Sequence, residues 1–299
     1  RLPVEDLCAF EDMFRNGLGC DMLTSIEEGF TLLSEEARQG APHLPFEGNL
    51  EQLKHSDGIL VIGANLSDYH QVAGFFIRRQ ALRGNTLVVV DPKANPLDDL
   101  TPYVLRSQAN NDTVTIREMV EALRRLSAGE EYQKRNQVVG QNDIPAEKIL
   151  AAAKALAACR QETIIFGKGI TSQNDPAVIA ALHELSHAIG KISGQPAVMI
   201  SIKGKANSLA ADQLKLDQPF NLQGRQAAYL VLGDDELSKR QLKALQGIPV
   251  LIVQAAYRSK LTEIADVVFP VTTWTEQDGH YLNLQGRLQK AAHIFEVPS

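Results

Sequence analysis

His183, Glu184 and His187 form the pattern His-Glu-x-x-His, which supplies two metal ligands and a general base in zinc peptidases. In a helix the two histidines lie one turn apart on one face, as a shared zinc ion requires. An apolar stripe runs along the same helix, and at about 100° per residue both histidines point away from its centre. A catalytic zinc needs a third protein ligand, but neither another histidine nor another glutamate follows before Glu236. We therefore interpret the motif as accidental and predict no metal site here.

Three apolar runs are each followed by residues that could meet a phosphate or a ribose at the end of a strand. These residues are Gly63 and Asn65, Asp91 and Lys93, and Gly167 and Gly169. Glycine lets a backbone approach a phosphate, amides at a helix N-terminus hold it, and an acid after a strand can bind ribose hydroxyls. Neither glycine loop completes the Gly-x-Gly-x-x-Gly fingerprint, so we predict no free NAD site. The alternative is that these glycines only form tight turns.

The three cysteines, Cys8, Cys20 and Cys159, are far apart and none is in Cys-x-x-Cys spacing. This spacing excludes an all-cysteine iron–sulfur cluster or a four-cysteine zinc site within this chain. Scattered cysteines are typical of a reducing compartment. Cys20 has no adjacent histidine or basic residue, so we expect an inert thiol that is buried or partly buried.

The composition is that of a globular protein, with 44% apolar and 22% charged residues among 299 and a net charge of −6. An acidic chain of this kind gives no electrostatic reason to expect nucleic acid or an anionic membrane as a partner. No apolar run approaches the roughly 20 residues of a membrane helix, so we predict no direct membrane insertion. The first residues have neither a methionine nor an apolar signal core, and we expect a piece of a longer protein.

Strands and helices must alternate to position the candidate residues. Apolar runs without polar alternation predict buried strands at 57–63, 86–92, 162–167, 227–233, 248–254 and 265–271. Helical patterns occupy 67–83, 113–129, 146–159, 175–190 and about 235–245, with Asp175 as N-cap and Pro176 at the first helical position. Such strands are typical of parallel sheets covered on both faces. We therefore predict an α/β protein with two Rossmann-like lobes.

The polar stretch 129–145 is the best candidate for a domain boundary. We predict a first lobe over 31–135 and a second lobe over 136–299. Residues 1–30 are expected to form an N-terminal helix that packs on the second lobe.

The C-terminal part of the chain carries the most specific pattern. Residues 265–292 combine a strand that ends in proline with a glutamate, a glycine, an asparagine and a Gly-Arg-x-Gln turn, at Pro270, Glu276, Gly279, Asn283, Gly286, Arg287 and Gln289. Together with the order of the three earlier loops, this pattern resembles the molybdopterin oxidoreductase family. His280 stands where that family usually has threonine, and Gln285 where it usually has an acid.

The resemblance implies the formate dehydrogenase/DMSO reductase-like middle domains of that family, with a groove at the strand ends. Its vestigial cofactor-binding residues would be Gly63, Asn65, Asp91, Lys93, Gly167, Gly169, Asn283, Gly286 and Arg287. We expect Arg287 to be structural and to tie its turn to a carboxylate or to backbone carbonyls. In this comparison the His-Glu-x-x-His motif falls on a helix that covers the second lobe.

Within the family the chain is most similar to the group formed by the large G subunits of NADH–quinone oxidoreductase, respiratory complex I. That likeness implies a structural and assembly role in an electron-transfer complex without bound molybdenum. Iron–sulfur clusters would belong only to an N-terminal region outside this chain, and the isolated chain would not be catalytic. Its partners would be other subunits of the complex. The location would be cytoplasmic, peripheral to the membrane through those subunits.

The alternative is part of an active molybdenum or tungsten enzyme, such as a formate dehydrogenase, with bis-molybdopterin guanine dinucleotide. Such an enzyme holds its metal through cysteine, selenocysteine or serine. Cys20 lacks the histidine that follows this ligand in formate dehydrogenases, and Cys159 stands between a predicted helix and a strand. We therefore expect no cofactor in this chain.

Overall fold

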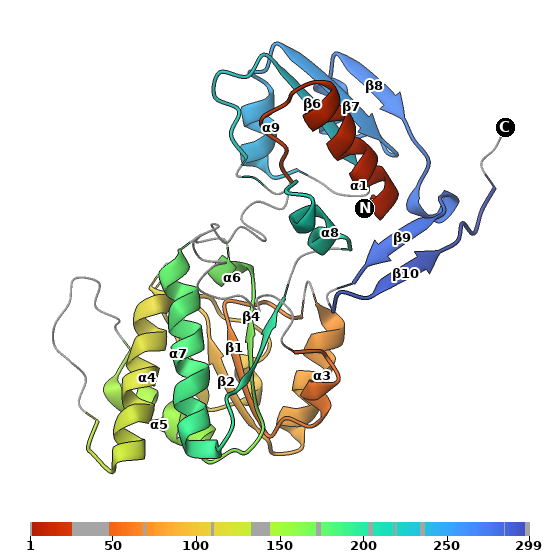
Figure 1. Cartoon of the computed structure of the whole chain (residues 1–299). Helices are drawn as coiled ribbons and strands as arrows, with labels where there is room; N and C mark the ends of the chain where they lie inside the picture. The colour runs from red at the N-terminus through yellow and green to blue at the C-terminus, as the bar shows by residue number, and fades with distance from the viewer. Residues whose placement is uncertain are drawn as a thin grey trace. The chain divides into compact units, whose positions relative to one another are not determined.

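The computed structural model describes residues 2–25, 48–67, 70–108, 111–132, 144–171, 175–202, 206–216, 218, 220–233, 237–283 and 285–296. The chain divides into two compact units (Figure 1). The middle unit comprises residues 29–204, and the terminal unit combines residues 1–28 with residues 205–299.

The middle unit contains a five-stranded parallel sheet. Its strands are β1 (Gly58–Ile62), β2 (Thr86–Val90), β3 (Tyr103–Leu105), β4 (Glu162–Phe166) and β5 (Val198–Ser201), in the order β3-β2-β1-β4-β5. Every residue of β1 and β4 is buried, because both faces of the sheet are covered. The prediction of parallel, helix-covered sheets is confirmed.

Helices cover the two faces of this sheet. They are α3 (Gln71–Leu82), α4 (Asp112–Ala128), α5 (Ala146–Ala157) and α7 (Pro176–Ser193). The short α6 (Lys168–Thr171) directly follows β4, and the 3₁₀ turns are η2 (Gln52–Lys54) and η3 (Asp98–Leu100). Alternate strand residues such as Leu60, Val88 and Ile164 share one core with α4, α5 and α7. Figure 1 shows α3 on the other side of the sheet.

Local signals account for where several helices begin and end. The Asp175 carboxylate accepts a hydrogen bond of 2.9 Å from the Ala177 amide, with Pro176 at the first position of α7, as predicted. Gly129 ends α4 and Gly194 ends α7, both with positive φ. By contrast, α3 begins at Gln71 and not at the expected residue 67.

The expected boundary between 135 and 136 is corrected by the sheet. β4 pairs directly with β1, and β5 pairs with β4, so both strands complete the first sheet. The helix that follows the polar stretch, α5, packs against α4 and β1–β3. The division falls instead at 204/205, and residues 1–28 belong with the C-terminal segment. Such long-range pairing leaves no mark in the local sequence, whereas a polar loop does.

The terminal unit contains a three-stranded parallel sheet and a hairpin. The sheet has β6 (Ala227–Leu232), β7 (Val250–Ala255) and β8 (Val267–Pro270), in that order, and the antiparallel hairpin has β9 (Gly279–Leu282) and β10 (Leu288–Ala291). Its helices are α1 (Val4–Glu11), continued by a π-helix (Asp12–Gly17), and α8 (Ser208–Gln213), α9 (Lys239–Leu245) and α10 (Lys260–Ile264), with a 3₁₀ turn η4 (Trp274–Glu276). Leu245 and Leu261 pack with Leu230 and Val253 in its core.

In the part of the chain that the structure describes, no helix is both long enough and apolar enough to cross a membrane.

Candidate functional site

The candidate residues of the middle unit meet at the carboxyl edge of its sheet. Successive strands run outward from β1 to β2 and β3 on one side, and from β4 to β5 on the other. The switch point of such a sheet lies between the two adjacent strands from which the order runs in opposite directions, here β1 and β4. Ligands of doubly wound folds bind at this point. Gly63 and Asn65 follow β1, and Gly167 and Gly169 follow β4, while Asp91 and Lys93 follow the neighbouring β2.

The glycines at the switch point pack against one another. The Gly169 amide donates to the Gly63 carbonyl at 2.9 Å, and Gly63 has a φ of 56°. A Cβ on Gly169 would lie 2.8 Å from the Gly63 oxygen, and one on Gly167 would lie 2.7 Å from the Ala64 Cβ. Glycine is therefore required for the close approach of the two loops. This contact favours the tight-turn interpretation that the sequence left open beside phosphate binding.

Asp91 is only 9% exposed, and its carboxylate is turned back onto its own loop. The Lys93 amide donates to Asp91 Oδ1 at 2.8 Å. Burial raises the pKa of Asp91, although the hydrogen bond from Lys93 acts in the opposite direction. The Lys93 side chain is exposed.

Arg106, which sequence reasoning missed, holds the loop after β2 in place. One guanidinium nitrogen donates to the Asp91 carbonyl at 3.1 Å and to the Lys93 carbonyl at 2.9 Å, and the other pairs with Asp98. Three acceptors from one loop therefore engage its positive charge. An arginine directly after the short strand β3, at the carboxyl end of the sheet, was the signal available in the sequence.

Among the described residues of the middle unit, the cysteine is Cys159, and it lies at the end of the sheet opposite the candidate loops. Cys159 is buried, and its Sγ lies 3.3 Å from the Ala155 carbonyl oxygen. A Cβ on Gly58, the first residue of β1, would lie 2.8 Å from that sulfur. Burial raises the pKa of the Cys159 thiol. Cys159 therefore lies at the amino edge, away from the candidate loops.

The His-Glu-x-x-His motif lies on α7, which covers the sheet and packs against α4. His183 is half-buried, His187 is exposed, and Glu184 pairs with Arg124 of α4 at 3.5 Å. No group of three metal-ligating side chains was found among the described residues. The lack of zinc at this helix stays a prediction.

Asn283, Gly286 and Arg287 lie in the turn between β9 and β10 of the terminal unit, whereas the other candidates belong to the middle unit. Asn283 Oδ1 accepts hydrogen bonds of 2.9 Å from the Gln285 and Arg287 amides, and Gly286 has a φ of 75°. Asn283 and Gly286 thus specify the turn. The Arg287 side chain is exposed and pairs with no carboxylate among the described residues, and its expected structural role stays a prediction.

His280, the departure from the family pattern, joins β9 to α1. Its backbone amide donates to Glu5 Oε2 at 3.0 Å, and its ring Nδ1 contacts Glu5 Oε1. The side-chain hydrogen bond with His280, supported by the backbone one, lowers the pKa of Glu5 to about 2.

Acid should therefore weaken the terminal unit through Glu5. Because the folded-state pKa is depressed, the contribution of Glu5 to stability is present above its ordinary value of 4.5 and is lost as the pH falls toward about 2. Glu5→Gln should remove part of the pH dependence of unfolding in this interval, while Glu263→Gln, an exposed position on α10, should not. Urea unfolding at stepped pH, followed by Trp274 fluorescence, measures both. A Glu5 carboxyl that titrates by NMR near 4.5 would contradict this prediction.

The model of the family described as molybdopterin oxidoreductase matches residues 2–299. The F420-dependent formate dehydrogenase subunit alpha of Methanocaldococcus jannaschii is 20% identical over 300 residues, covering 81% of this chain and 45% of that protein. The NADH-quinone oxidoreductase G subunit of Rickettsia felis is 29% identical over 139 residues, covering 46% of this chain and 20% of that protein. The chain thus spans less than half the length of either relative.

Solved structures show the same fold at low sequence identity. A chain of the formyltransferase/hydrolase complex of Methylorubrum extorquens, determined with methylofuran, is similar with a TM-score of 0.63 and 16% identity, covering 98% of this chain and 84% of that chain. Acetylene hydratase of Pelobacter acetylenicus is similar with a TM-score of 0.55 and 16% identity, covering 81% and 44%.

Proposed function

Because the chain belongs to the molybdopterin oxidoreductase family, we propose that it is the molybdopterin-fold domain of a NADH–quinone oxidoreductase large subunit. In this proposal the domain has a structural and assembly role, holds no molybdenum cofactor and carries out no catalysis by itself. The domain binds other subunits of a dehydrogenase complex. It lies on the cytoplasmic side of a membrane and is associated with that membrane through those subunits. The observation that carries the proposal is the chemistry of the carboxyl edge in the middle unit.

The described residues of that edge fit a bound metal cofactor poorly. Soft metals favour thiolate ligands, but Cys159 lies at the opposite edge of the sheet. Arg106 is engaged by its own loop, so Lys93 is the cation left exposed among the described side chains that follow β1, β2 and β4. An anionic dinucleotide would gain little electrostatic attraction there. The contact between Gly63 and Gly169 also occupies the backbone that would approach a phosphate.

The relatives support a role inside a larger assembly, because their names describe them as subunits. The NADH-quinone oxidoreductase relative has the higher identity, over about half of the chain. The match to the formate dehydrogenase subunit extends over 81% of the chain. This longer match favours a second candidate, part of an active molybdenum or tungsten enzyme. In that enzyme the same loops and Lys93 would hold the phosphates of a bis-molybdopterin guanine dinucleotide, which supplies the redox chemistry when bound.

The chain, purified from a host that makes molybdopterin, should release no pterin and contain no molybdenum or tungsten. Pterin fluorescence after denaturation and elemental analysis by mass spectrometry measure these quantities, and zinc is measured in the same sample. We expect each to stay below about one-tenth per chain, because the required ligands are missing from the described edge. A formate dehydrogenase alpha subunit from the same host is the positive control.

A value near one pterin per chain would replace the first candidate with the second. A zinc content near one that is lost in His183→Ala would overturn the interpretation of the His-Glu-x-x-His motif. In the assembled complex, Lys93→Ala should leave NADH–quinone turnover unchanged under the first candidate. It should lower cofactor content under the second.

A further inference from the structure

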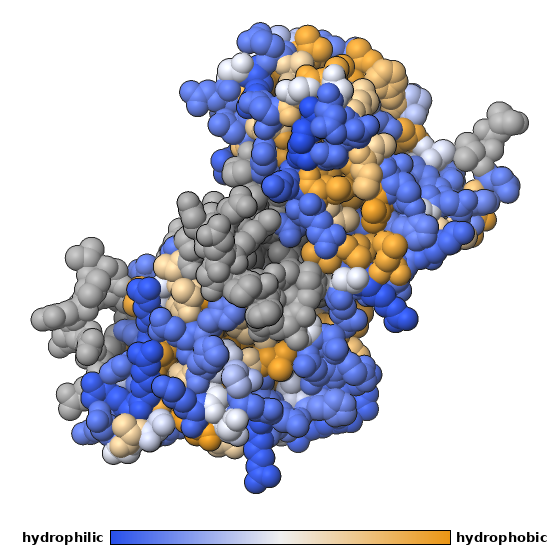
Figure 2. All heavy atoms as spheres, in the orientation of Figure 1, coloured by the Kyte–Doolittle hydropathy of each residue, from blue (hydrophilic) through white to orange (hydrophobic). Residues whose placement is uncertain are grey.

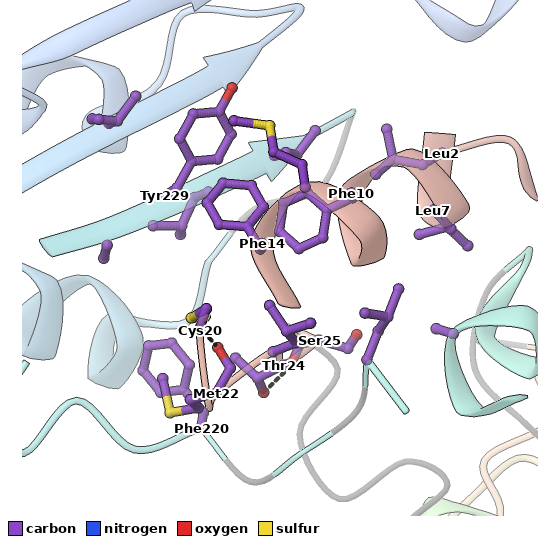
Figure 3. A pocket seen from close by; sticks show the side chains of 18 of the residues that line it. Leu2, Leu7, Phe10, Phe14, Cys20, Met22, Thr24, Ser25, Phe220 and Tyr229 are labelled. Carbon is purple, nitrogen blue, oxygen red and sulfur yellow. Dashed lines mark hydrogen bonds between the residues drawn. The ribbon is translucent and has the colours of Figure 1, made fainter. Parts of the chain in front are cut away.

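The terminal unit contains a pocket of about 660 Å³ that lies along the edge strand β6. One wall is formed by α1 and the π-helix, and the opposite wall by the segment 20–25 with Phe220 (Figure 3). Every described residue of its lining belongs to the terminal unit. Its volume falls within the range of roughly 300–1,000 Å³ that is typical of small-molecule sites.

An aromatic cluster forms the first wall. Phe10 and Phe14 lie with ring centroids 4.5 Å apart, and Phe14 lies 5.1 Å from Tyr229 of β6. The Tyr229 hydroxyl bonds to Gln254 Oε1 at 2.8 Å, which fixes the ring. Phe14 belongs to the π-helix, a conformation that is frequent at functional sites. The wall is therefore a preformed surface for an aromatic ring.

Cys20 and Met22 project from the other side of the pocket (Figure 3). Cys20 is half-buried, and its Sγ lies 3.4 Å from the Met22 carbonyl oxygen. The hydroxyl of Thr24 bonds to the Gln218 carbonyl, and the two residues also form a β-bridge. This short segment is thus attached to the rest of the unit and gives the pocket a fixed second side.

The lining has little charge to offer a ligand. Among the described lining residues, Arg225 is the one with an acidic or basic side chain. Its guanidinium pairs with Asp21. An anionic ligand would find no unpaired cation there, and the apolar lining would penalise its desolvation. Apolar side chains also come to the surface around α1 (Figure 2). Two residues of the pocket lining, Met13 and Leu18, are more than half exposed. These residues make an apolar mouth.

We propose that this pocket binds an uncharged, largely apolar small molecule with an aromatic ring. The ring packs against Phe10, Phe14 and Tyr229, and the bound molecule covers the Cys20 thiol. The site involves none of the strand-end loops of the middle unit, so its test is independent of the function proposed above.

The uncharged dye N-phenyl-1-naphthylamine is a suitable probe, because its fluorescence rises in apolar surroundings. We expect saturable binding of one dye per chain. Ala211→Phe, which places a ring inside the pocket, should weaken binding about tenfold or more, whereas Ala151→Phe, at an exposed position of α5, should not. Adenosine monophosphate should not displace the dye.

Maleimide labelling of the wild-type chain, read by peptide mass spectrometry, tests the location without any substitution. Cys20 lines the pocket, while Cys8 on α1 is exposed and outside the lining. With the dye at about ten times its Kd, Cys20 labelling should slow about tenfold by mass action, with Cys8 labelling unchanged. Equal rates with and without dye, equal slowing at both cysteines, or full affinity in a folded Ala211→Phe variant would each overturn the proposal.

Discussion

Asn207→Ala will lower the free energy of unfolding of the terminal unit by about 3 kcal/mol. Asn207 is 3% exposed and sits in the left-handed region with a φ of 64°. Its side-chain nitrogen Nδ2 donates to the Leu2 carbonyl at 2.6 Å and to the His280 carbonyl at 3.2 Å. Its Oδ1 accepts from the Leu282 backbone amide. Alanine would leave these backbone groups unpaired and would also strain the backbone, so both costs add.

Two matched variants separate these costs. Asn207→Gly loses the same hydrogen bonds but accepts the positive φ, so it should be about 1 kcal/mol less destabilised than Asn207→Ala. The single tryptophan of the chain, Trp274, lies in the terminal unit, so its fluorescence in urea reports this transition. An alanine variant within about 0.5 kcal/mol of wild type would show that water replaces the lost partners.

Gly169→Ala should lower the stability of the middle unit by about 2–3 kcal/mol. The added methyl group would lie 2.8 Å from the Gly63 carbonyl oxygen and 2.9 Å from its Cα, and both are backbone atoms that cannot turn aside. The two switch-point loops would have to separate. Far-UV circular dichroism should show an earlier transition, while the Trp274 transition of the terminal unit stays in place.

Gly129→Ala is the control for this substitution. Gly129 has a positive φ of 70°, which Gly169 does not share, but a Cβ there would meet nothing within 4 Å. Only backbone strain of about 1 kcal/mol is then expected. If Gly169→Ala cost no more than Gly129→Ala, the packing of the two loops would not be tight, and the switch point would have room for a phosphate.

Much of the middle unit could be predicted because its signals are local. The unbroken apolar run of β1 indicated a strand covered on both faces, and Asp175 and Pro176 marked the start of α7. The domain boundary could not be predicted from residues 129–145, because it depends on the pairing of β1 with β4 across about a hundred residues. Polarity shows where the chain meets water and not which strands are neighbours.

The sequence predicted which loops of the middle unit share one edge of the sheet but not what those loops contact. Topology placed Gly63 and Gly169 at one edge of the sheet. The sequence could not distinguish a glycine whose backbone binds a phosphate from one that packs against another loop. Arg106 was missed because its three acceptors belong to residues 8–15 positions earlier, folded back by the sheet. The pocket of the terminal unit joins Phe14 with Tyr229, more than two hundred residues later, which no local pattern records.

The interruption of the terminal unit by the middle unit determines the order in which the chain can fold during synthesis. Glu5 can form its hydrogen bonds with His280 only after the ribosome has added 275 more residues. At roughly 5–20 residues per second, the N-terminal segment leaves the ribosome on the order of 15–55 s before that partner exists. The middle unit is contiguous and can complete its sheet in this interval. Phe10 of α1 and Phe14 of the π-helix meanwhile lack Tyr229, so these rings stay without their native aromatic partner until the C-terminal part of the unit has been made.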